Sequence, residues 1–259
     1  MEPTISLTSG QIEFYHTSGY LAIEAITTHD EIEWMRGIYD HLFAIRAGRE
    51  EGNQFDLAGT DEEGKEAALP QILGPSNYAP ELKDTLLRVN ALHLARQLLG
   101  SQADGGGDHA ILKPSGGPET PWHQDEAYWD PGVLHEAISI WVPLQPATIE
   151  NGCMWFVPGS HRLEVAPHHP IDNDPRVHGL EINEADVSEA VVCPIPAGGA
   201  TIHHCRTLHY TGPNRSDEPR RAYIVGYGIP GTPVDPPRDF YWQLQRETPR
   251  EERAKRSSS

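Results

Sequence analysis

The segment from Pro118 to Pro131, "PETPWHQDEAYWDP", combines three prolines and two tryptophans with one histidine and four acids. In an extended strand the side chains of residues i and i+2 point to the same side, about 7 Å apart at the backbone. His123 and Asp125 can therefore face one metal ion, while Gln124 points away. Taken alone, the pair also fits a salt-bridged strand end. A motif as short as His-x-Asp is expected about once by chance in a chain with 14 histidines, so it needs support from other residues.

This segment belongs to a series of short apolar runs separated by Gly, Pro and Asn clusters. Such a rhythm is typical of a β-sandwich or barrel, and we predict a mainly β core over residues 108–230. Residues 162–189 break the rhythm and are expected to form an inserted loop of the kind that often contacts substrate. The predicted strands are "HAILK" (109–113), "PWHQD" (121–125), "AISIWVPL" (137–144), "CMWFVP" (153–158), "AVVCPI" (190–195), "ATIHHC" (200–205) and "RRAYIVGYG" (220–228).

The first 107 residues show helical spacing instead. Apolar side chains recur at helical intervals over residues 30–47 and again over residues 80–100. We therefore expect a single domain, residues 1–259, in which a helical N-terminal extension, residues 1–107, packs outside the β core. Residues 245–259 are charged and poor in apolar side chains, and we expect them to form a flexible tail.

The formal net charge of −18 at pH 7 limits the possible partners. A chain this acidic repels phosphate backbones and anionic lipid unless a local basic patch opposes the field, so we expect neither nucleic acid nor a membrane as partner. The first 30 residues lack the pattern of a signal peptide, which predicts a cytoplasmic protein. Cys153, Cys193 and Cys205 stand singly in apolar stretches, as reduced core thiols do.

A second group of candidate ligands lies in residues 197–228, "AGGATIHHCRTLHYTGPNRSDEPRRAYIVGYG". It contributes His203, His204 and His209, followed by two adjacent arginines beyond a Gly-Pro-Asn turn. Two histidines and one carboxylate on one face of a metal, with the other positions open, suit a non-haem ferrous centre that activates oxygen. Adjacent strand residues point opposite ways, so only one of His203 and His204 can face inward. We expect neither to be a ligand, and His204 to lie beside the site or in the core.

Four segments, in order along the chain, resemble the phytanoyl-CoA dioxygenase family of iron(II)- and 2-oxoglutarate-dependent oxygenases, whose small-molecule members include ectoine hydroxylase. The resemblance covers about residues 109–230, and four ordered motifs are specific to the family. It implies a double-stranded β-helix, a jelly-roll or cupin-like barrel of two sheets with iron near its open end. The segments are "TPWHQDEAYW" (120–129), "ISIWVPL" (138–144), "NGCMWFVPGSH" (151–161) and "LHYTGPNRSDEPRRA" (208–222).

The resemblance also implies the residues of the site. It places the metal ligands on His123, Asp125 and His209. The family's arginine for the distal carboxylate of 2-oxoglutarate, eleven residues after the distal histidine, falls on Arg220. Its two parallel hydrogen bonds to that carboxylate would be joined by a third from Thr211.

Four further residues are candidates on the same resemblance. Lys113 ends a predicted strand, and either reaches the other carboxylate of the co-substrate or meets only a surface acid. Trp129 and Tyr128 would line the substrate pocket at the barrel mouth, with simple loop packing as the alternative. Tyr210 replaces a glycine of the family pattern His-Gly-Ser-Gly-x-Asn and is expected to narrow or decorate the site.

Two predictions concern neighbouring residues. Arg221 should lie on the outer face and pair with a surface acid, because adjacent strand residues point to opposite sides. His168, His169 and His178 in the inserted loop are candidates for substrate contact, although exposed loop histidines commonly have no specific role.

Together these features predict an enzyme that uses Fe(II), 2-oxoglutarate and O2 to hydroxylate a C–H bond of a small metabolite, releasing succinate and CO2. Asp125 favours hydroxylation, desaturation or cyclisation, because related halogenases carry a small residue in its place. A zinc-dependent hydrolase or isomerase on a cupin-like barrel is one alternative, although it has no need of Arg220. A non-catalytic β-sandwich binding module is another. The net charge favours a small neutral or cationic substrate over coenzyme A.

Overall fold

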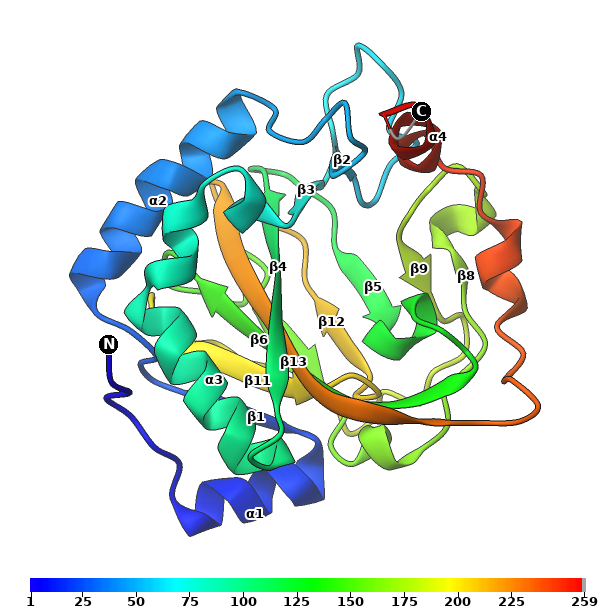
Figure 1. The fold of residues 1–259 in the computed structure, drawn as a ribbon. Helices are drawn as coiled ribbons and strands as arrows, with labels where there is room; N and C mark the ends of the chain where they lie inside the picture. The colour runs from blue at the N-terminus through cyan, green and yellow to red at the C-terminus, as the bar shows by residue number, and fades with distance from the viewer. Residues whose placement is uncertain (258–259) are drawn as a thin grey trace.

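A computed structural model gives the fold and describes residues 1–257 of the chain (Figure 1). Within these residues the central strands form a seven-stranded and a four-stranded antiparallel sheet. The two sheets pack against each other through apolar side chains, among them Trp141 from the large sheet and Phe156 from the small one. The predicted mainly β barrel with helices packed outside is confirmed.

The large sheet separates the helices from the interior of the barrel. Along its central strand, Tyr223 and Val225 pack toward the helices, whereas Ala222 and Ile224 pack toward the small sheet. Arg220 shares the parity of Ala222 and Ile224, and it therefore points into the barrel. The strand order is β1 (Tyr20–Ile23), β11 (Ala200–His204), β6 (Val133–Pro143), β13 (Arg220–Pro233), β4 (Asp104–Lys113), β3 (Pro70–Leu73) and β2 (Gln54–Asp56).

The small sheet closes the other side of the barrel. Its order is β10 (Val191–Cys193), β7 (Met154–Phe156), β12 (His209–Thr211) and β5 (Thr120–His123). Strand β12 was not among the predicted strands, because three residues give too little alternation to detect. All three cysteines are free and buried, as predicted.

Three helices cover the outer face of the large sheet (Figure 1): α1 (Ser9–Ser18), α2 (His29–Ala44) and α3 (Leu86–Leu99). The carboxylate of Glu31, in the first turn of α2, accepts hydrogen bonds from the backbone N–H groups of Leu86 and Leu87 at 2.7 and 2.9 Å. This carboxylate therefore joins the starts of α2 and α3. Among the described residues, none of the helices is long and apolar enough to cross a membrane.

The N-terminal region differs from the predicted helical extension over residues 1–107. Helix α1 was not expected, and strands β1, β2 and β3 belong to the large sheet. The predicted helix over residues 80–100 begins as a 3-10 turn, Pro80–Asp84, and α3 follows it. Strand β1 is held by β11, with Tyr20 opposite His203, so its stability comes from a partner far away in sequence that local periodicity does not reveal.

The C-terminal segment also differs from its prediction as a flexible tail over residues 245–259. Helix α4 (Pro249–Ser257) is held by Arg253, which forms a buried ion pair with Asp61. Just before it, the indole N–H of Trp242 donates to the carbonyl oxygen of Ala127 at 2.9 Å. The charges that suggested disorder are in part paired inside the molecule. Residues 258–259 lie outside the described residues.

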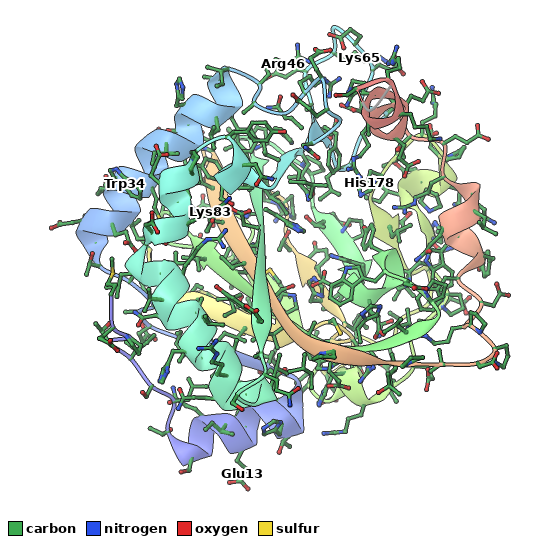
Figure 2. All side chains as sticks on the ribbon, in the orientation of Figure 1. Glu13, Trp34, Arg46, Lys65, Lys83 and His178 are labelled. Carbon is green, nitrogen blue, oxygen red and sulfur yellow. The ribbon has the colours of Figure 1, made fainter. Side chains whose placement is uncertain are left out.

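The inserted segment, residues 162–189, is irregular apart from short elements such as the pair β8 (His169–Pro170) and β9 (Leu180–Glu181). It packs beside β5, where the backbone N–H of Ile182 donates to the carbonyl oxygen of Trp122 at 3.0 Å. Figure 2 shows His178 of this segment beneath the C-terminal helix. The insertion covers the side of the barrel next to β5, whereas α4 packs on residues 49–61.

Candidate active site

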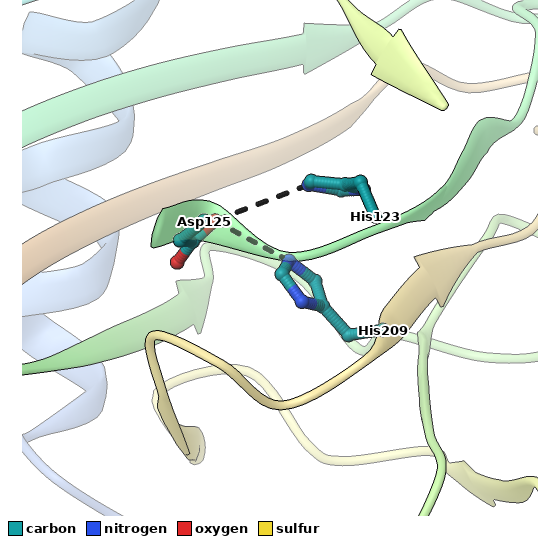
Figure 3. A group of neighbouring side chains, drawn as sticks. All are labelled: His123, Asp125 and His209. Carbon is teal, nitrogen blue, oxygen red and sulfur yellow. Dashed lines mark ion pairs between the residues drawn. The ribbon is translucent and has the colours of Figure 1, made fainter. Parts of the chain in front are cut away.

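His123, Asp125 and His209 lie together at the ends of two neighbouring strands. His209 begins β12 and is directly opposite His123, the last residue of β5. Both side chains point toward Asp125 (Figure 3), with Nε2 to Oδ1 distances of 3.5 Å from His209 and 3.9 Å from His123. One ligand atom from each of the three residues lies within 4.8 Å of the other two. The three side chains are therefore close enough to bind one metal ion.

The backbone that positions Asp125 differs from the predicted strand. Strand β5 ends at His123, and Asp125 begins a 3-10 turn, Asp125–Tyr128. The turn, rather than strand alternation, brings the carboxylate beside the two imidazoles. Gln124 points away, as predicted, and its side-chain amide donates to the carbonyl oxygen of Arg206 at 2.8 Å.

Hydrogen bonds fix which nitrogen of each ligand histidine faces the site. Nδ1 of His123 lies 2.7 Å from the carbonyl oxygen of Pro121, and Nδ1 of His209 lies 2.9 Å from that of Thr207. A carbonyl only accepts, so each Nδ1 carries the proton and each Nε2 offers a lone pair. Burial lowers the pKa of His123 and holds the pKa of His209 well below its ordinary value. Both imidazoles are therefore neutral at neutral pH, as metal ligands must be.

The two oxygens of the Asp125 carboxylate have different partners. Oδ2 accepts a hydrogen bond from the Ser139 hydroxyl at 2.7 Å and lies 3.3 Å from Nε2 of His203, while Oδ1 faces the two ligand histidines. Burial acts to raise the pKa of Asp125, but His209 and His203 outweigh it and hold the pKa well below its ordinary value. Two neutral imidazoles and one ionised carboxylate oxygen fit iron(II), with the remaining positions left to other ligands.

Sequence reasoning listed His203 as a candidate but expected His204 to lie beside the site, and it did not single out Ser139. His203 lies against Asp125, whereas His204 is buried on the opposite side of β11, with Nε2 3.2 Å from the Glu136 carboxylate. A signal for Ser139 was present, since it is the one polar residue in the apolar run "ISIWVPL". A polar side chain in such an apolar strand commonly has a hydrogen-bond partner, and for the partly buried Ser139 the partner is Asp125.

Replacing Ser139 by alanine should weaken iron(II) binding by about tenfold, because Oδ2 of Asp125 loses the hydroxyl that orients the carboxylate. Anaerobic titration against a competing chelator measures the affinity. Thr201→Val is a matched control, since the Thr201 hydroxyl is buried and has no hydrogen-bond partner among residues 1–257. Equal affinities of Ser139→Ala and the unmodified protein would show that this hydroxyl does not orient the ligand.

The site opens into a cavity of about 490 Å³. Arg220 lines one end, where its side chain is 1% exposed and its guanidinium lies 5.1 Å from the centre of the Trp141 ring. Nε and Nη1 of Arg220 are buried, and no group in the described part of the chain accepts a hydrogen bond from them. Burial lowers the pKa of Arg220 to about 10, so the group is still charged at neutral pH. A buried cation with free N–H groups fits a carboxylate ligand.

Thr211 lines the cavity at the same end, but Lys113 does not line it. The Lys113 ammonium is buried and donates to the Thr211 hydroxyl at 2.9 Å and to the carbonyl oxygen of Gly212 at 2.5 Å. Lys113 is therefore directed away from the cavity in which the co-substrate was expected, and among residues 1–257 it forms no ion pair with a surface acid. It lies behind Thr211 and holds that residue in place. The Thr211 hydroxyl also lies 3.0 Å from that of Thr120, another residue of the cavity wall.

Of the three aromatic candidates, Trp129 and Tyr128 line the cavity and Tyr210 does not. His209 and Thr211 point inward, so strand alternation turns Tyr210 outward. Its ring stacks on Trp122, and its hydroxyl donates to the Glu119 carboxylate at 2.6 Å. The expectation that Tyr210 narrows the pocket is corrected accordingly.

The inserted segment contributes one of its three histidines to the cavity. His178 lines the wall, and its ring stacks on that of Tyr128 with 5.7 Å between centres. His168 is buried elsewhere, where its Nε2 accepts a hydrogen bond from the backbone N–H of Gln124. His169 lies 3.6 Å from the Glu181 carboxylate.

The family model for phytanoyl-CoA dioxygenase matches residues 15–222, most of the chain. The chain belongs to the phytanoyl-CoA dioxygenase family. Among curated members, it is 26% identical over 258 residues to a phytanoyl-CoA dioxygenase of Arabidopsis thaliana, with 86% of this chain and 89% of that one covered. It is 28% identical over 163 residues to a probable alpha-ketoglutarate-dependent hypophosphite dioxygenase of Stutzerimonas stutzeri. That match covers 61% of this chain but only 57% of the relative's length.

Among solved structures, EvdO2 from Micromonospora carbonacea var. aurantiaca, determined with bound 2-oxoglutarate, is 36% identical. The alignment covers 93% of this chain and 99% of EvdO2, with a TM-score of 0.79. The predicted membership of the phytanoyl-CoA dioxygenase family is confirmed by these matches. So is the predicted class, the non-haem iron, 2-oxoglutarate-dependent dioxygenases.

Proposed function

We propose that this protein uses Fe(II), 2-oxoglutarate and O2 to hydroxylate a C–H bond of a small metabolite. In the balanced reaction one oxygen atom enters the substrate as a hydroxyl group, and the other enters succinate as 2-oxoglutarate loses CO2. His123, Asp125 and His209 would hold the metal. The single observation that carries the proposal is that these residues share one cavity with the buried, unsatisfied guanidinium of Arg220.

Different residues of the chain would bind the metal, orient 2-oxoglutarate and exclude water. The histidine Nε2 atoms and Oδ1 of Asp125 would supply three ligands to the metal and leave its remaining positions to ligands that come from solution. Arg220 would bind the distal carboxylate of 2-oxoglutarate and fix its orientation. Trp141, Met154 and Ile224 line the cavity with apolar surface and keep water from that end. When bound, iron would supply the oxygen-activating chemistry, in which O2 is the oxidant and 2-oxoglutarate provides two of the electrons that reduce it.

The cavity also bears on the two alternatives. A zinc hydrolase would use the same three ligands to activate water, but it would gain nothing from a buried cation whose N–H groups are free. A non-catalytic binding module requires neither the three ligands nor the arginine. The three free, buried cysteines support a reducing compartment, and we propose the cytoplasm as the site of action.

The central test is spectroscopic. Anaerobic protein should bind one ferrous ion per chain, and 2-oxoglutarate should then produce a weak charge-transfer band in the visible spectrum. The band requires chelation of iron by 2-oxoglutarate, for which three protein ligands would leave room. Tight zinc binding, with no band after iron is supplied, would support the hydrolase instead. A screen of metabolite pools for stimulated succinate release would then identify substrates.

A further inference from the structure

Two arginines from the C-terminal segment line the cavity near Tyr128 and His178. The Arg246 guanidinium lies 5.5 Å from the centre of the Tyr128 ring, and its Nη1 is 3.4 Å from the carbonyl oxygen of His178. The Arg250 guanidinium lies 4.6 Å from the centre of the Phe55 ring. Both cations are therefore held against aromatic faces, which fix the planes of their guanidinium groups.

Neither arginine has a carboxylate within ion-pair distance among residues 1–257. Nε of Arg246 is buried and lacks a hydrogen-bond partner in the same part of the chain, while Nε of Arg250 donates to the carbonyl oxygen of Gly52 at 2.9 Å. Arg253, which lies on α4 together with Arg250, differs from both arginines because it forms a buried ion pair with Asp61. Glu251 also lines the cavity, and its charge acts to raise the pKa of Arg250 against the larger effect of burial, but it forms no ion pair with either arginine.

The unpaired charges stand out because the whole chain carries a formal net charge of −18. Partly desolvated cations without counter-ions cost free energy, and an anion that enters the cavity would offset this cost. His178 adds a neutral polar group to the same wall. Its pKa is held well below the ordinary value, mainly by burial and further by the charges of Arg246 and Arg250. Its buried Nδ1 has no hydrogen-bond partner within the described residues.

The position of these groups relative to the metal ligands suits a substrate. The Tyr128 ring lies edge-on to that of His123, with 6.4 Å between centres, and Arg246 packs on the same Tyr128 ring. One aromatic side chain therefore separates this basic wall from the metal site. A molecule bound by Arg246 and Arg250 would extend along Tyr128 toward the metal ligands, while Arg220, which contacts Trp141 instead, would hold the co-substrate.

We infer that the substrate carries an anionic group, a carboxylate or a phosphate, which binds between Arg246 and Arg250. This inference rests on the proposed function, since it assigns a substrate class to the same cavity. It replaces the expectation of a neutral or cationic substrate, which depended on the net charge of the chain. The local field of the cavity wall, rather than the net charge, governs which small molecule enters.

Matched pairs of small molecules test the inference. Benzoate and phenyl phosphate are the anionic probes, and benzamide and phenol are their uncharged counterparts. Calorimetric titrations use anaerobic enzyme that holds Fe(II) and saturating 2-oxoglutarate, so that Arg220 is already occupied. At least one anion should bind about tenfold or more tightly than its counterpart. The tighter of the two anions indicates whether the site prefers carboxylate or phosphate.

Variants then locate the binding site. Arg246→Gln with Arg250→Gln should reduce the preference for the anion to within about twofold, whereas lysine at both positions should retain part of it. Arg176→Gln is the matched control, because Arg176 is an exposed arginine paired with Asp174, and it should keep the full preference. The iron and 2-oxoglutarate band of each variant verifies that the protein is folded.

Three results would overturn the inference: no preference for either anion, an unchanged preference in the double glutamine variant, or anion binding that saturating 2-oxoglutarate abolishes. The last would place the anion on Arg220. Failure of the proposed function is recognised separately, because the band of the unmodified protein would then not form at all. If the charge-transfer band is normal but no anionic probe is preferred, only the inferred substrate class is refuted.

Discussion

Replacing His209 by alanine is expected to abolish iron-dependent turnover and the charge-transfer band with 2-oxoglutarate. The variant loses one of three groups whose ligand atoms lie within 4.8 Å of one another, and a two-ligand remnant binds the metal weakly. Iron affinity should fall by at least about 100-fold, as judged by competition with a chelator. His209 is at a strand end, so thermal unfolding monitored by circular dichroism should still show one cooperative transition.

His204→Gln is the appropriate control for this experiment. His204 is also buried, but it faces the helix-covered side of β11, where it meets Glu136. Its replacement should leave the band and the iron affinity intact. An active His209→Ala variant beside an inactive His204→Gln variant would show that the distal ligand has been assigned to the wrong histidine.

Replacing Arg220 by alanine should raise the concentration of 2-oxoglutarate required for half-maximal turnover by at least about tenfold. The buried guanidinium would supply charge-assisted hydrogen bonds to the carboxylate, and within residues 1–257 Lys113 cannot replace them, since it is directed toward Thr211 and Gly212. Iron affinity should change little, because Arg220 does not contact the three ligands. Lysine at this position should recover only part of the loss, since an ammonium cannot form two parallel hydrogen bonds with a carboxylate.

The neighbouring arginine provides the control. Arg221 lies on the outer face, where its Nε is 2.6 Å from the Asp40 carboxylate of α2, as the strand alternation predicted. That pair is partly exposed and is worth about 0 to 1 kcal/mol of stability. Arg221→Ala should therefore leave the 2-oxoglutarate dependence unchanged. Equal effects of the two substitutions would indicate that the carboxylate does not bind at Arg220.

Strand alternation allowed the sequence to predict the directions of Arg220 and Arg221, because both lie in a long strand with partners on either side. The same rule, applied to β12, would have turned Tyr210 outward once His209 and Thr211 were placed inside. Asp125 was placed beside His123 for a reason that proved wrong, since the chain leaves the strand between them. The two side chains are nevertheless close, because a tight turn also keeps nearby side chains together.

Other features depend on contacts that no local pattern contains. Helix α4 has a charged sequence, and its position is fixed by Asp61, almost two hundred residues earlier in the chain. Strand β1 exists as a strand because it pairs with β11. The contribution of Arg246 and Arg250 to the cavity follows from the same docking of the C-terminus, so the charge of the pocket could not be predicted from the composition of the chain.

The C-terminal segment has a consequence for how the specificity of such an oxygenase can evolve. Residues 246, 250 and 251 form part of the cavity wall, yet they belong to neither of the two main sheets and supply none of the three metal ligands. Mutations there can exchange the groups that a substrate meets while the iron chemistry stays intact. Residues 246–251 are therefore a place where substitutions can change the substrate that the cavity accepts without altering the three candidate metal ligands.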